Sequence, residues 1–481
     1  MESRPDSSDS LPGSLAALTA SARRDLERLN FPPANWVPPS SGPDGRPMLD
    51  VLVVGGGMCG QAALFALRRE GIANVRCIDR EPRGLEGPWA TYARMETLRS
   101  PKHLTGPDLG VPSLTYRAWH EAKYGAAHWA QLHKIPRLDW ADYLLWVRDA
   151  VGLWIENEVE AEVLRLRGNI VEATLSTGVV FARKVVLALG REGSGDLRWP
   201  VFDTFEPRDR GARVFHSADD IDFKALRGKR IGVLGAGSSA FDNAGTALEA
   251  GAAQVTMFAR RPYLPQVNKS KWTAFPGFQH GYASLDDANR WRFYTYIFGE
   301  QVPPPYESVL RCEKHAGFAL RFSEGWTDLS EASNQVVVRT PLGTHEFDAV
   351  IVCTGFDVDL MERPEVAEFR DAIDTWRAHV PPDEAEAFPE EARFPYLGDA
   401  FQLQGRAPGL GRVHVFNWGA TLSHGALGGD IPGVEVGARR LAQGVARDLF
   451  LDDVDRHWAR LQVQNEDEMR PTRYFVPLEK R

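Results

Sequence analysis

Two short glycine loops hold the residues whose types and spacing are suited to binding a nucleotide. The first loop, of the form GxGxxG, follows the apolar run VLVV and consists of Gly55, Gly56, Gly57, Met58, Cys59 and Gly60. In such a loop the first glycine allows a tight turn, the second lets the backbone approach a pyrophosphate, and the third lets a helix pack closely on the strand. The N-terminus of that helix then faces the phosphates with unpaired N–H groups. The loop therefore predicts a dinucleotide site.

An acidic residue supports this prediction. Asp79 stands at the end of the run NVRCID, which is typical of the second strand of the same unit. A carboxylate at that point can accept hydrogen bonds from the ribose hydroxyls of the ligand. A glycine loop alone is weak evidence, but here a strand, a helix and a terminal acid accompany it. We assign Arg80 and Val159 to the same site.

The second loop is of the form GxGxxA and consists of Gly235, Ala236, Gly237, Ser238, Ser239 and Ala240. The strand-like run after it, VTMFA, ends not in an acid but in Arg260 and Arg261. An acid would repel a 2′-phosphate, whereas a guanidinium can pair with it through two hydrogen bonds. We therefore expect the second unit to bind NADPH rather than NADH. The alternative is that Arg260 and Arg261 are an ordinary exposed turn pair.

Strands and helices that alternate along the chain must position both loops. This alternation implies parallel βαβ units, so we expect an α/β protein with two Rossmann-like domains. By analogy we also expect the NADPH domain to be inserted into the FAD domain. The order of the ligands, FAD first and NADPH second, rests on analogy. The expected division is an N-terminal extension at 1–48 with a helix at 14–29, a first half of the FAD domain at 49–199, the NADPH domain at 200–345, and a second half of the FAD domain at 346–481 with an acidic surface excursion at 361–395.

The overall composition excludes several classes of protein. The 481 residues are 43% hydrophobic and 25% charged, as in ordinary globular proteins, and this length predicts two or three domains. The net charge of −9 argues against a general nucleic-acid binder, and no apolar run reaches the ~18 residues of a membrane-spanning helix. Four scattered cysteines show no CxxC pair and no metal-binding spacing, which favours a reducing compartment. Since the N-terminus resembles no secretory signal, we expect a cytoplasmic enzyme without a metal, and a homo-oligomer is left open.

Three segments outside the loops resemble one enzyme family, the class B flavoprotein monooxygenases. These segments are Gly87-Pro88-Trp89, Phe215-His216-Ser217 and Cys353-Thr354-Gly355-Phe356. The family includes flavin-containing monooxygenases, Baeyer–Villiger enzymes and lysine/ornithine N-hydroxylases, and the resemblance extends from Leu49 to about Phe450. It implies FAD at the first loop, with Trp89, Thr354 and Gly355 near it, and NADPH at the second loop.

Two further stretches resemble the N-hydroxylase branch of that family. They run from Met95 to Leu104 and from Asn417 to Gly425. The resemblance makes Lys102, Asn417 and His424 candidate catalytic residues. Lys102 would donate a hydrogen bond to the activated oxygen or orient a substrate carboxylate, and it could equally be a solvated loop lysine. His424 would line the flavin edge or bond to backbone, and Asn417 could cap a turn instead of binding a ligand.

The implied reaction is an oxygenation of a small organic substrate by dioxygen. NADPH reduces FAD, dioxygen adds to form a C4a-hydroperoxyflavin, and one oxygen atom enters the substrate. The protein positions the cofactor and excludes water. We prefer N- or S-oxygenation over Baeyer–Villiger oxidation of a ketone. The alternatives are an NADPH-dependent flavin or disulfide oxidoreductase without oxygen insertion, against whose disulfide form the absent CxxC counts, and a non-catalytic nucleotide-binding protein.

An aromatic tract follows the two arginines. Residues 263–306 are unusually rich in Trp, Tyr and Phe. They could line an apolar substrate pocket, but the core of a helical insertion is the interpretation that we favour.

Overall fold

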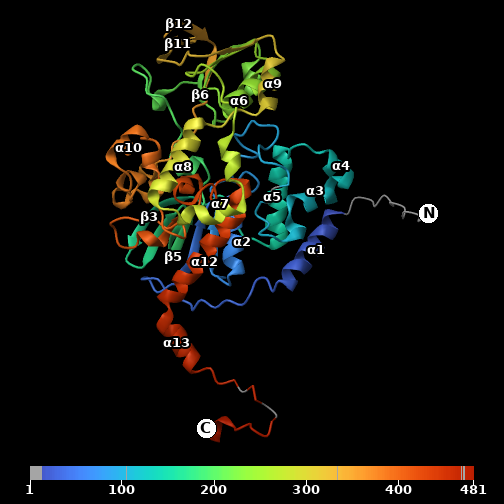
Figure 1. The fold of residues 1–481 in the computed structure, drawn as a ribbon, viewed down its shortest axis with the longest axis vertical. Coiled ribbons are helices and arrows are strands. Elements are labelled where there is room, and N and C mark those ends of the chain that lie inside the picture. Colours follow the sequence, from blue (N-terminus) through green and yellow to red (C-terminus); the bar gives the residue numbers. More distant parts are fainter. Residues whose placement is uncertain (1–13, 104–105, 333, 467, 470–471, 481) are drawn as a thin grey trace, which may run out of the picture.

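In the computed structural model, which describes residues 14–103, 106–332, 334–466, 468–469 and 472–480, the described strands form three sheets (Figure 1). The start of the expected N-terminal extension, residues 1–13, and Leu104 of the loop compared with the N-hydroxylases lie outside the described residues. Two of the sheets are built around parallel strands and belong to two separate units. The sequence-based prediction of an α/β protein with two such units is confirmed.

The first sheet has the order β2-β1-β5-β4-β3, and β14 pairs with β5. Its strands are β1 (Leu49–Val54), β2 (Val75–Ile78), β3 (Ala161–Arg167), β4 (Ile170–Leu175), β5 (Gly178–Leu187) and β14 (Val413–Val415). The pairs β1–β2, β1–β5 and β14–β5 are parallel, whereas β3, β4 and β5 form an antiparallel meander. In β1 only Leu49 is partly exposed, as expected of a central strand that is covered on both faces.

The second sheet has the order β6-β13-β7-β8-β9 and is parallel throughout. Its strands are β6 (Val214–His216), β7 (Arg230–Leu234), β8 (Gln254–Phe258), β9 (Phe318–Arg321) and β13 (Ala349–Val352). A three-stranded antiparallel sheet at the tip of this unit contains β10 (Asp328–Glu331), β11 (Val336–Thr340) and β12 (Gly343–Phe347). The chain thus leaves the first sheet after β5 and returns to it at β14, so that the second unit is an insertion.

The last strand of the second sheet differs from the division expected from the sequence. We placed residues from 346 onward in the first unit, but β13 hydrogen-bonds to β6 and β7. An apolar run such as AVIV fits a buried strand of either sheet, and only the pairing decides between them. The crossover to the first unit therefore follows Val352.

The helices cover the sheets and fill the side of the first unit, as Figure 1 shows. α2 (Met58–Arg69) and α6 (Ser238–Glu249) follow the two glycine loops. α1 (Leu15–Arg28), α3 (Tyr116–Tyr124), α4 (Ala126–Gln131) and α5 (Arg137–Val151) lie together beside the first unit. The remaining helices are α7 (Pro276–Gly281), α8 (Asp287–Glu300), α9 (Tyr306–Glu313), α10 (Pro382–Ala387), α11 (Thr421–His424), α12 (Val434–Asp452) and α13 (Val454–Gln462).

Part of the aromatic tract and part of the 361–395 excursion form a common core. The fully buried indole of Trp376 stacks on Trp291 of α8, with ring centroids 6.1 Å apart. Phe278 and Tyr294 are buried in the same cluster. Core packing therefore accounts for this part of the tract, and the excursion is anchored to the protein rather than lying wholly on its surface.

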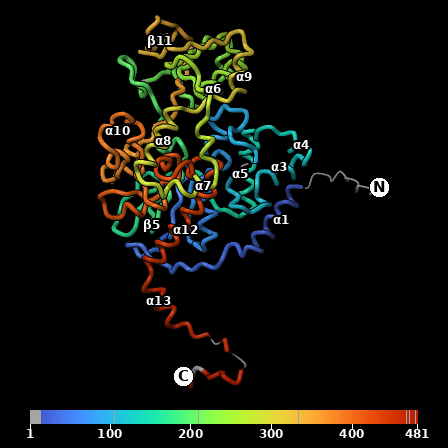
Figure 2. The backbone as a smooth tube through the Cα atoms, in the orientation of Figure 1, coloured from blue at the N-terminus to red at the C-terminus, as the bar shows by residue number. Residues whose placement is uncertain are grey.

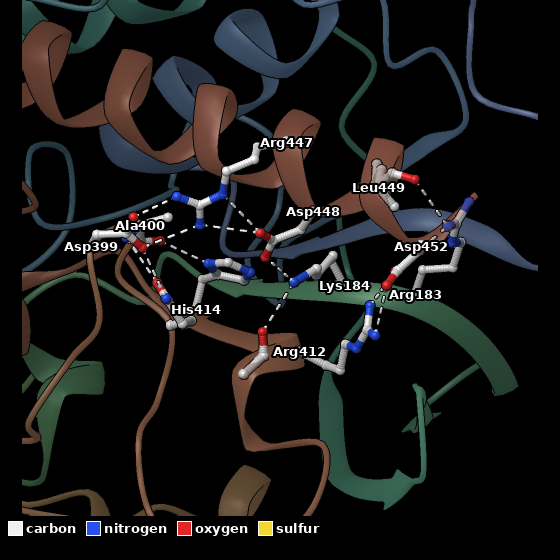
Figure 3. A network of polar contacts seen from close by, with 12 residues as sticks. Arg183, Lys184, Asp399, Ala400, Arg412, His414, Arg447, Asp448, Leu449 and Asp452 are labelled. Carbon is white, nitrogen blue, oxygen red and sulfur yellow. Dashed lines mark hydrogen bonds and ion pairs between the residues drawn. The ribbon is translucent and has the colours of Figure 1, made fainter. Parts of the chain in front are cut away.

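Ion pairs tie α12 to the first sheet, as Figure 3 shows. Asp448 accepts a hydrogen bond from Lys184 of β5, and Arg447 pairs with Asp399. Asp452 pairs with Arg412, the residue before β14. Such pairs between half-buried partners hold one register of the helix on the sheet. They fix the C-terminal end of α12, whose first residue is Val434.

The segment between α1 and β1 passes beneath the first unit and meets α13 there (Figure 2). Arg456 donates a hydrogen bond to Pro39 O at 2.8 Å, and Arg460 donates to Trp36 O at 3.2 Å. Beyond α13 the chain extends away from the body of the protein. Among the described residues, no helix combines the length and the apolar character needed to cross a bilayer.

Candidate active site

A cavity of about 860 Å³ lies where the two units meet. The first unit contributes the first glycine loop, the ends of β2 and β5, and much of the segment from Leu85 to Ser100. The second unit contributes Ser217, after β6, and Ser239, Asp242 and Asn243 of α6. In α/β proteins ligands bind at the carboxyl ends of parallel strands. The cavity follows this rule for both sheets at once.

The glycines of the first loop divide into two kinds. Gly55 has a φ of +102°, and a Cβ on it would lie 2.5 Å from Ala188 O. A Cβ on Gly60 would lie 1.8 Å from Gly55 O. By contrast, a Cβ on Gly57 would meet nothing closer than 3.9 Å, and Gly57 lines the cavity. The fold itself requires Gly55 and Gly60, whereas a bare Gly57 leaves room for a ligand.

Asp79 is held by the backbone at the edge of the cavity. Its Oδ2 accepts a hydrogen bond from Gly56 N at 2.7 Å, and its Oδ1 accepts one from Glu81 N at 2.8 Å. Burial raises the pKa of Asp79, while these two N–H groups act against the rise. Each carboxylate oxygen keeps a further lone pair for a ligand. Val159 lies beside Asp79 and donates its backbone N–H to Asp79 O at 3.0 Å.

These residues fit the diphosphate and ribose of FAD. α2 begins directly after Gly57, and no side chain caps its N-terminus, so that N–H groups of its first turn stay available to phosphate oxygens. Gly57, Met58 and Cys59 would hold the diphosphate, and Asp79 would bind a ribose. Nothing in the packing of the chain needs the open space at Gly57, which makes that space the best sign of a bound cofactor.

The second loop repeats the geometry of the first. Gly235 has a φ of +115°, and a Cβ on it would lie 2.6 Å from Cys353 O. A Cβ on Gly237 would meet nothing within 4 Å. Gly237 precedes α6, whose N-terminus also lacks a side-chain cap. Ala240 is fully buried, as the close helix–strand contact requires.

Arg260 and Arg261 follow β8 at the tip of the second unit. Arg260 is exposed, and Arg261 is half-buried. Neither guanidinium pairs with a carboxylate in the part of the chain that the structure describes. Both are therefore available to a 2′-phosphate at the position where Asp79 stands in the first unit.

The cavity brings together about half of the residues that the sequence analysis singled out. The lining includes Gly55, Gly57, Met58, Cys59, Asp79, Arg80, Trp89, Val159, Gly355 and Ser239. Outside it lie Gly60, Gly235, Gly237, Ser238, Ala240, Arg260, Arg261, Thr354, Lys102, Asn417 and His424. Thr354 bonds through its hydroxyl to Arg198 O next to the crossover. The assignments of individual residues to the cofactors remain predictions.

Lys102 points away from the cavity. Its Nζ donates hydrogen bonds to Trp129 O at 2.7 Å and Leu132 O at 2.6 Å. The ammonium group also lies 4.8 Å from the centre of the Trp129 ring. These contacts fasten the 95–103 loop to α4 and use two of the three N–H donors of the ammonium group.

His424 and Asn417 are likewise engaged with their own surroundings. His424 is buried, its Nε2 lies 2.8 Å from Gly398 O, and its ring stacks on Phe401. Burial lowers the pKa of His424 to about 3, so the ring is neutral at physiological pH. Asn417 accepts a hydrogen bond from Gly419 N at 2.9 Å and donates one to Gly193 O at 3.2 Å. Since Gly193 lines the cavity, Asn417 supports the wall.

The charged residues at the junction of the two units were not predicted from the sequence. Arg99 lies 3.4 Å from Asp242 of α6, and both line the cavity. Asp430, just before α12, lines it as well. Arg99 lies in the same Met95–Leu104 stretch as Lys102, but no spacing rule indicates which of two basic residues in a loop faces inward.

No cluster of His, Cys, Asp or Glu among the described residues is suited to a metal ion. The four cysteines are buried and unpaired. Burial raises the pKa of Cys59 and of Cys312 to about 12 and raises the pKa of Cys77 and Cys353 further. Thiols in this state are inert toward disulfide exchange.

Known proteins are similar to this chain in sequence or in fold. The profile of the pyridine nucleotide-disulphide oxidoreductase family matches residues 52–274. The ornithine hydroxylase of Pseudomonas aeruginosa is 17% identical, with a TM-score of 0.64 over 84% of this chain and 100% of that chain. The ornithine N-hydroxylase of Kutzneria is 14% identical, with a TM-score of 0.65 over the same shares. At such identities the likeness concerns the fold.

A curated relative is much more similar in sequence. The FAD-dependent urate hydroxylase of Xanthomonas campestris is 42% identical over 451 residues, which are 92% of this chain and 94% of that protein. The chain therefore belongs to the family of this FAD-dependent hydroxylase.

Proposed function

We propose that this monooxygenase hydroxylates urate, with FAD at the first glycine loop and NADPH at the second. The observation that carries the proposal is a cavity lined by residues of both nucleotide-binding units. The similarity to a urate hydroxylase over nearly the whole chain supports the choice of substrate. Overall, urate, dioxygen, NADPH and a proton would yield hydroxylated urate, water and NADP⁺.

Residues of the chain would bind the cofactors and shape the reaction space. FAD, when bound, supplies the redox chemistry by accepting hydride from NADPH and activating dioxygen. Gly57 and Asp79 would hold its diphosphate and ribose at one end of the cavity. Apolar side chains such as Met58, Leu98 and Ile431 line the cavity and would exclude water, which otherwise promotes release of peroxide.

Hydroxylation of urate narrows the reaction expected from the sequence. N- or S-oxygenation was preferred there, and ketone oxidation was the alternative. Because the curated relative is a urate hydroxylase, hydroxylation of a purine is favoured over heteroatom oxygenation and over ketone oxidation. Amines, sulfides and ketones therefore become comparison substrates.

A disulfide reductase is the competing function that the matched family profile suggests. Such an enzyme needs a pair of cysteines that exchange with the flavin and with substrate. The four cysteines here are buried, and burial raises the pKa of each thiol. This observation disfavours disulfide reduction.

Oxygen-18 labelling distinguishes these functions. The holoenzyme is incubated with NADPH and ¹⁸O₂ in the presence of urate, an amine, a sulfide or a ketone, and peroxide is counted. The proposal expects one labelled oxygen atom in the product from urate, with NADPH consumption matched to product. If NADPH is oxidised at the same rate with and without urate, and all oxygen appears as peroxide, the protein is an oxidase or reductase instead.

We place the enzyme in the cytoplasm. The unpaired cysteines suit a reducing compartment, and NADPH is a cytoplasmic reductant. Cell fractionation with an antibody against the chain tests this placement, and recovery outside the cytoplasmic fraction would contradict it.

A further inference from the structure

Arginine side chains are the cations available to an anionic ligand in the cavity. Among the described lining residues these arginines are Arg80, Arg94, Arg99, Arg191 and Arg363, and no lysine or histidine accompanies them. A guanidinium offers five N–H donors in a planar fork. The contacts of each guanidinium show whether its N–H donors are free to bind a ligand.

Three of the arginines are satisfied by oxygen acceptors. Arg80 donates to Glu192 at 2.7 Å, and Arg363 donates to Glu365 at 2.6 Å. Arg94 donates to Thr91 O at 2.7 Å and to Asp219 O at 3.3 Å. These side chains build the wall of the cavity, and their acceptors hold each guanidinium in place.

A fourth arginine is fixed by stacking. The guanidinium of Arg191 lies 3.7 Å from the centre of the Trp418 ring, a distance at which cation–π attraction holds the side chain in place. Its nearest carboxylate is Asp430, at 3.9 Å. Its face is therefore covered, although its edge points into the cavity.

Arg99 is neither stacked on an aromatic ring nor bonded to an oxygen acceptor at less than 3.4 Å among the described residues. Its single polar contact among the described residues is the long 3.4 Å contact with Asp242, whose other oxygen already accepts a hydrogen bond from Ser308 at 2.7 Å. The side chain of Arg99 keeps 42% of its surface accessible, and that surface faces the cavity. Desolvation lowers the pKa of Arg99, which is the condition of a cation that lacks a close counter-ion.

Arg99 lies at the junction of the two units. Hydride must pass from a nucleotide bound by the second unit to a flavin bound by the first. Arg99 belongs to the first unit and Asp242 to α6 of the second, so the pair spans the junction where this transfer would occur. The proposed function assigns the diphosphate of NADPH to the α6 N-terminus and its 2′-phosphate to Arg260 and Arg261, and these two arginines lie outside the cavity.

We propose that Arg99 is the substrate-binding cation of the site and that its guanidinium pairs with the anionic edge of urate, while Asp242 holds the side chain in position before substrate arrives. This inference rests on the proposed function. Urate is a planar weak acid that carries one negative charge at neutral pH, with nitrogen and oxygen acceptors side by side on its edge. A planar guanidinium matches such an edge with two parallel hydrogen bonds, which an ammonium group cannot do.

Two substitutions with opposite expected signs test this inference. Arg99→Gln removes the cation, whereas Asp242→Asn removes the carboxylate that competes with urate for it. The binding of urate to the oxidised holoenzyme is measured by the change in flavin absorbance, without NADPH. Arg99→Gln is expected to raise the dissociation constant about 10- to 100-fold, Arg99→Lys to raise it less, and Asp242→Asn to lower it. The rate of anaerobic flavin reduction by NADPH, measured without urate, reports whether Arg99→Gln also disturbs the dinucleotide.

An exposed arginine outside the cavity provides the matched control. Arg117→Gln, in an exposed residue of α3, should leave urate binding unchanged. If the wild-type enzyme hydroxylates urate and Arg99→Gln binds it equally well, the role of Arg99 is wrong and the proposed function stands. An effect of Arg99→Gln on the Michaelis constant for NADPH alone, or weaker urate binding in Asp242→Asn, would also overturn the inference, because the pair would then serve the dinucleotide or the junction of the units. If the wild-type enzyme neither binds nor oxidises urate, both proposals fall.

Discussion

The two glycine loops have nearly the same backbone and different surroundings. In each, the first glycine has a left-handed φ and packs on a backbone carbonyl, and the middle glycine leaves open space. The first loop lines the cavity and is followed by the buried carboxylate of Asp79. Of the second loop only Ser239 lines the cavity, and the exposed Arg260 stands at the equivalent strand end. The common backbone suits a diphosphate in both units. The residue at the strand end would decide between a ribose with a free 2′-hydroxyl and one with a 2′-phosphate. We expect the ligand of the first loop, which lines the cavity, to be retained and the ligand of the second loop to exchange.

The largest expected effect is that of a methyl group added at Gly57 or at Gly237, where the protein leaves open space. Gly57→Ala should reduce FAD affinity by about a hundredfold or more, because the methyl group would occupy the diphosphate position. Gly237→Ala should leave FAD in place and raise the Michaelis constant for NADPH. Flavin content after purification and steady-state kinetics measure these effects.

Gly60→Ala is the matched control for a structural glycine. Its Cβ would lie 1.8 Å from Gly55 O, so this variant should lose thermal stability, whereas the apoprotein of Gly57→Ala should melt like the wild-type apoprotein. A fully yellow Gly57→Ala protein would contradict the assignment of FAD to this loop.

The second expected effect concerns the strand ends. Replacing Arg260 and Arg261 together by Ala removes charge-assisted hydrogen bonds to the 2′-phosphate, each worth about 1.5–3 kcal/mol. The Michaelis constant for NADPH should rise roughly ten- to a hundredfold, and that for NADH should change little. Wild-type enzyme that used NADH as efficiently as NADPH would return both arginines to ordinary exposed turn residues.

The third expected effect separates a structural from a catalytic Lys102. Lys102→Met keeps the length of the side chain but leaves Trp129 O and Leu132 O without their donor. We expect a loss of about 2–3 kcal/mol in the free energy of unfolding and an unchanged kcat. Urea denaturation and turnover at saturating substrate measure the two quantities. A stable variant with a strongly reduced kcat would support the catalytic role that the resemblance implied.

The smallest expected effect is a dependence of stability on acid. His414 and His424 in the first unit are buried, and burial lowers the pKa of each to about 3 from an ordinary 6.5. Below pH 6.5 the unfolded chain takes up protons that the folded protein excludes, so stability should fall by about 1.4 kcal/mol per pH unit for each histidine, and it should be flat above this pH. Urea denaturation at pH 5 and pH 7 measures the slope, and His424→Gln should remove its own share. An unchanged slope in that variant would mean that His424 is protonated in the folded protein.

Much of the fold could be predicted because its signals are local. The run VLVV, the spacing of Gly55, Gly57 and Gly60, and the helix after them specify one βαβ unit without any long-range information. The point at which the chain returns to the first unit could not be predicted, because the strand before Thr354 is apolar and would suit either sheet. Its hydrogen-bonding partners, β6 and β7, come from distant parts of the chain.

The sequence by itself determined the two nucleotide-binding units, and also the contrast between Asp79 and Arg260, because loop geometry and charge at a strand end depend on neighbouring residues. Only the tertiary structure decided which basic residue of the 95–103 loop reaches the cavity. Carbonyl groups at the end of α4 take the ammonium group of Lys102, and packing turns Arg99 toward α6. The direction of a loop side chain depends on acceptors that other segments supply, and no local pattern encodes them.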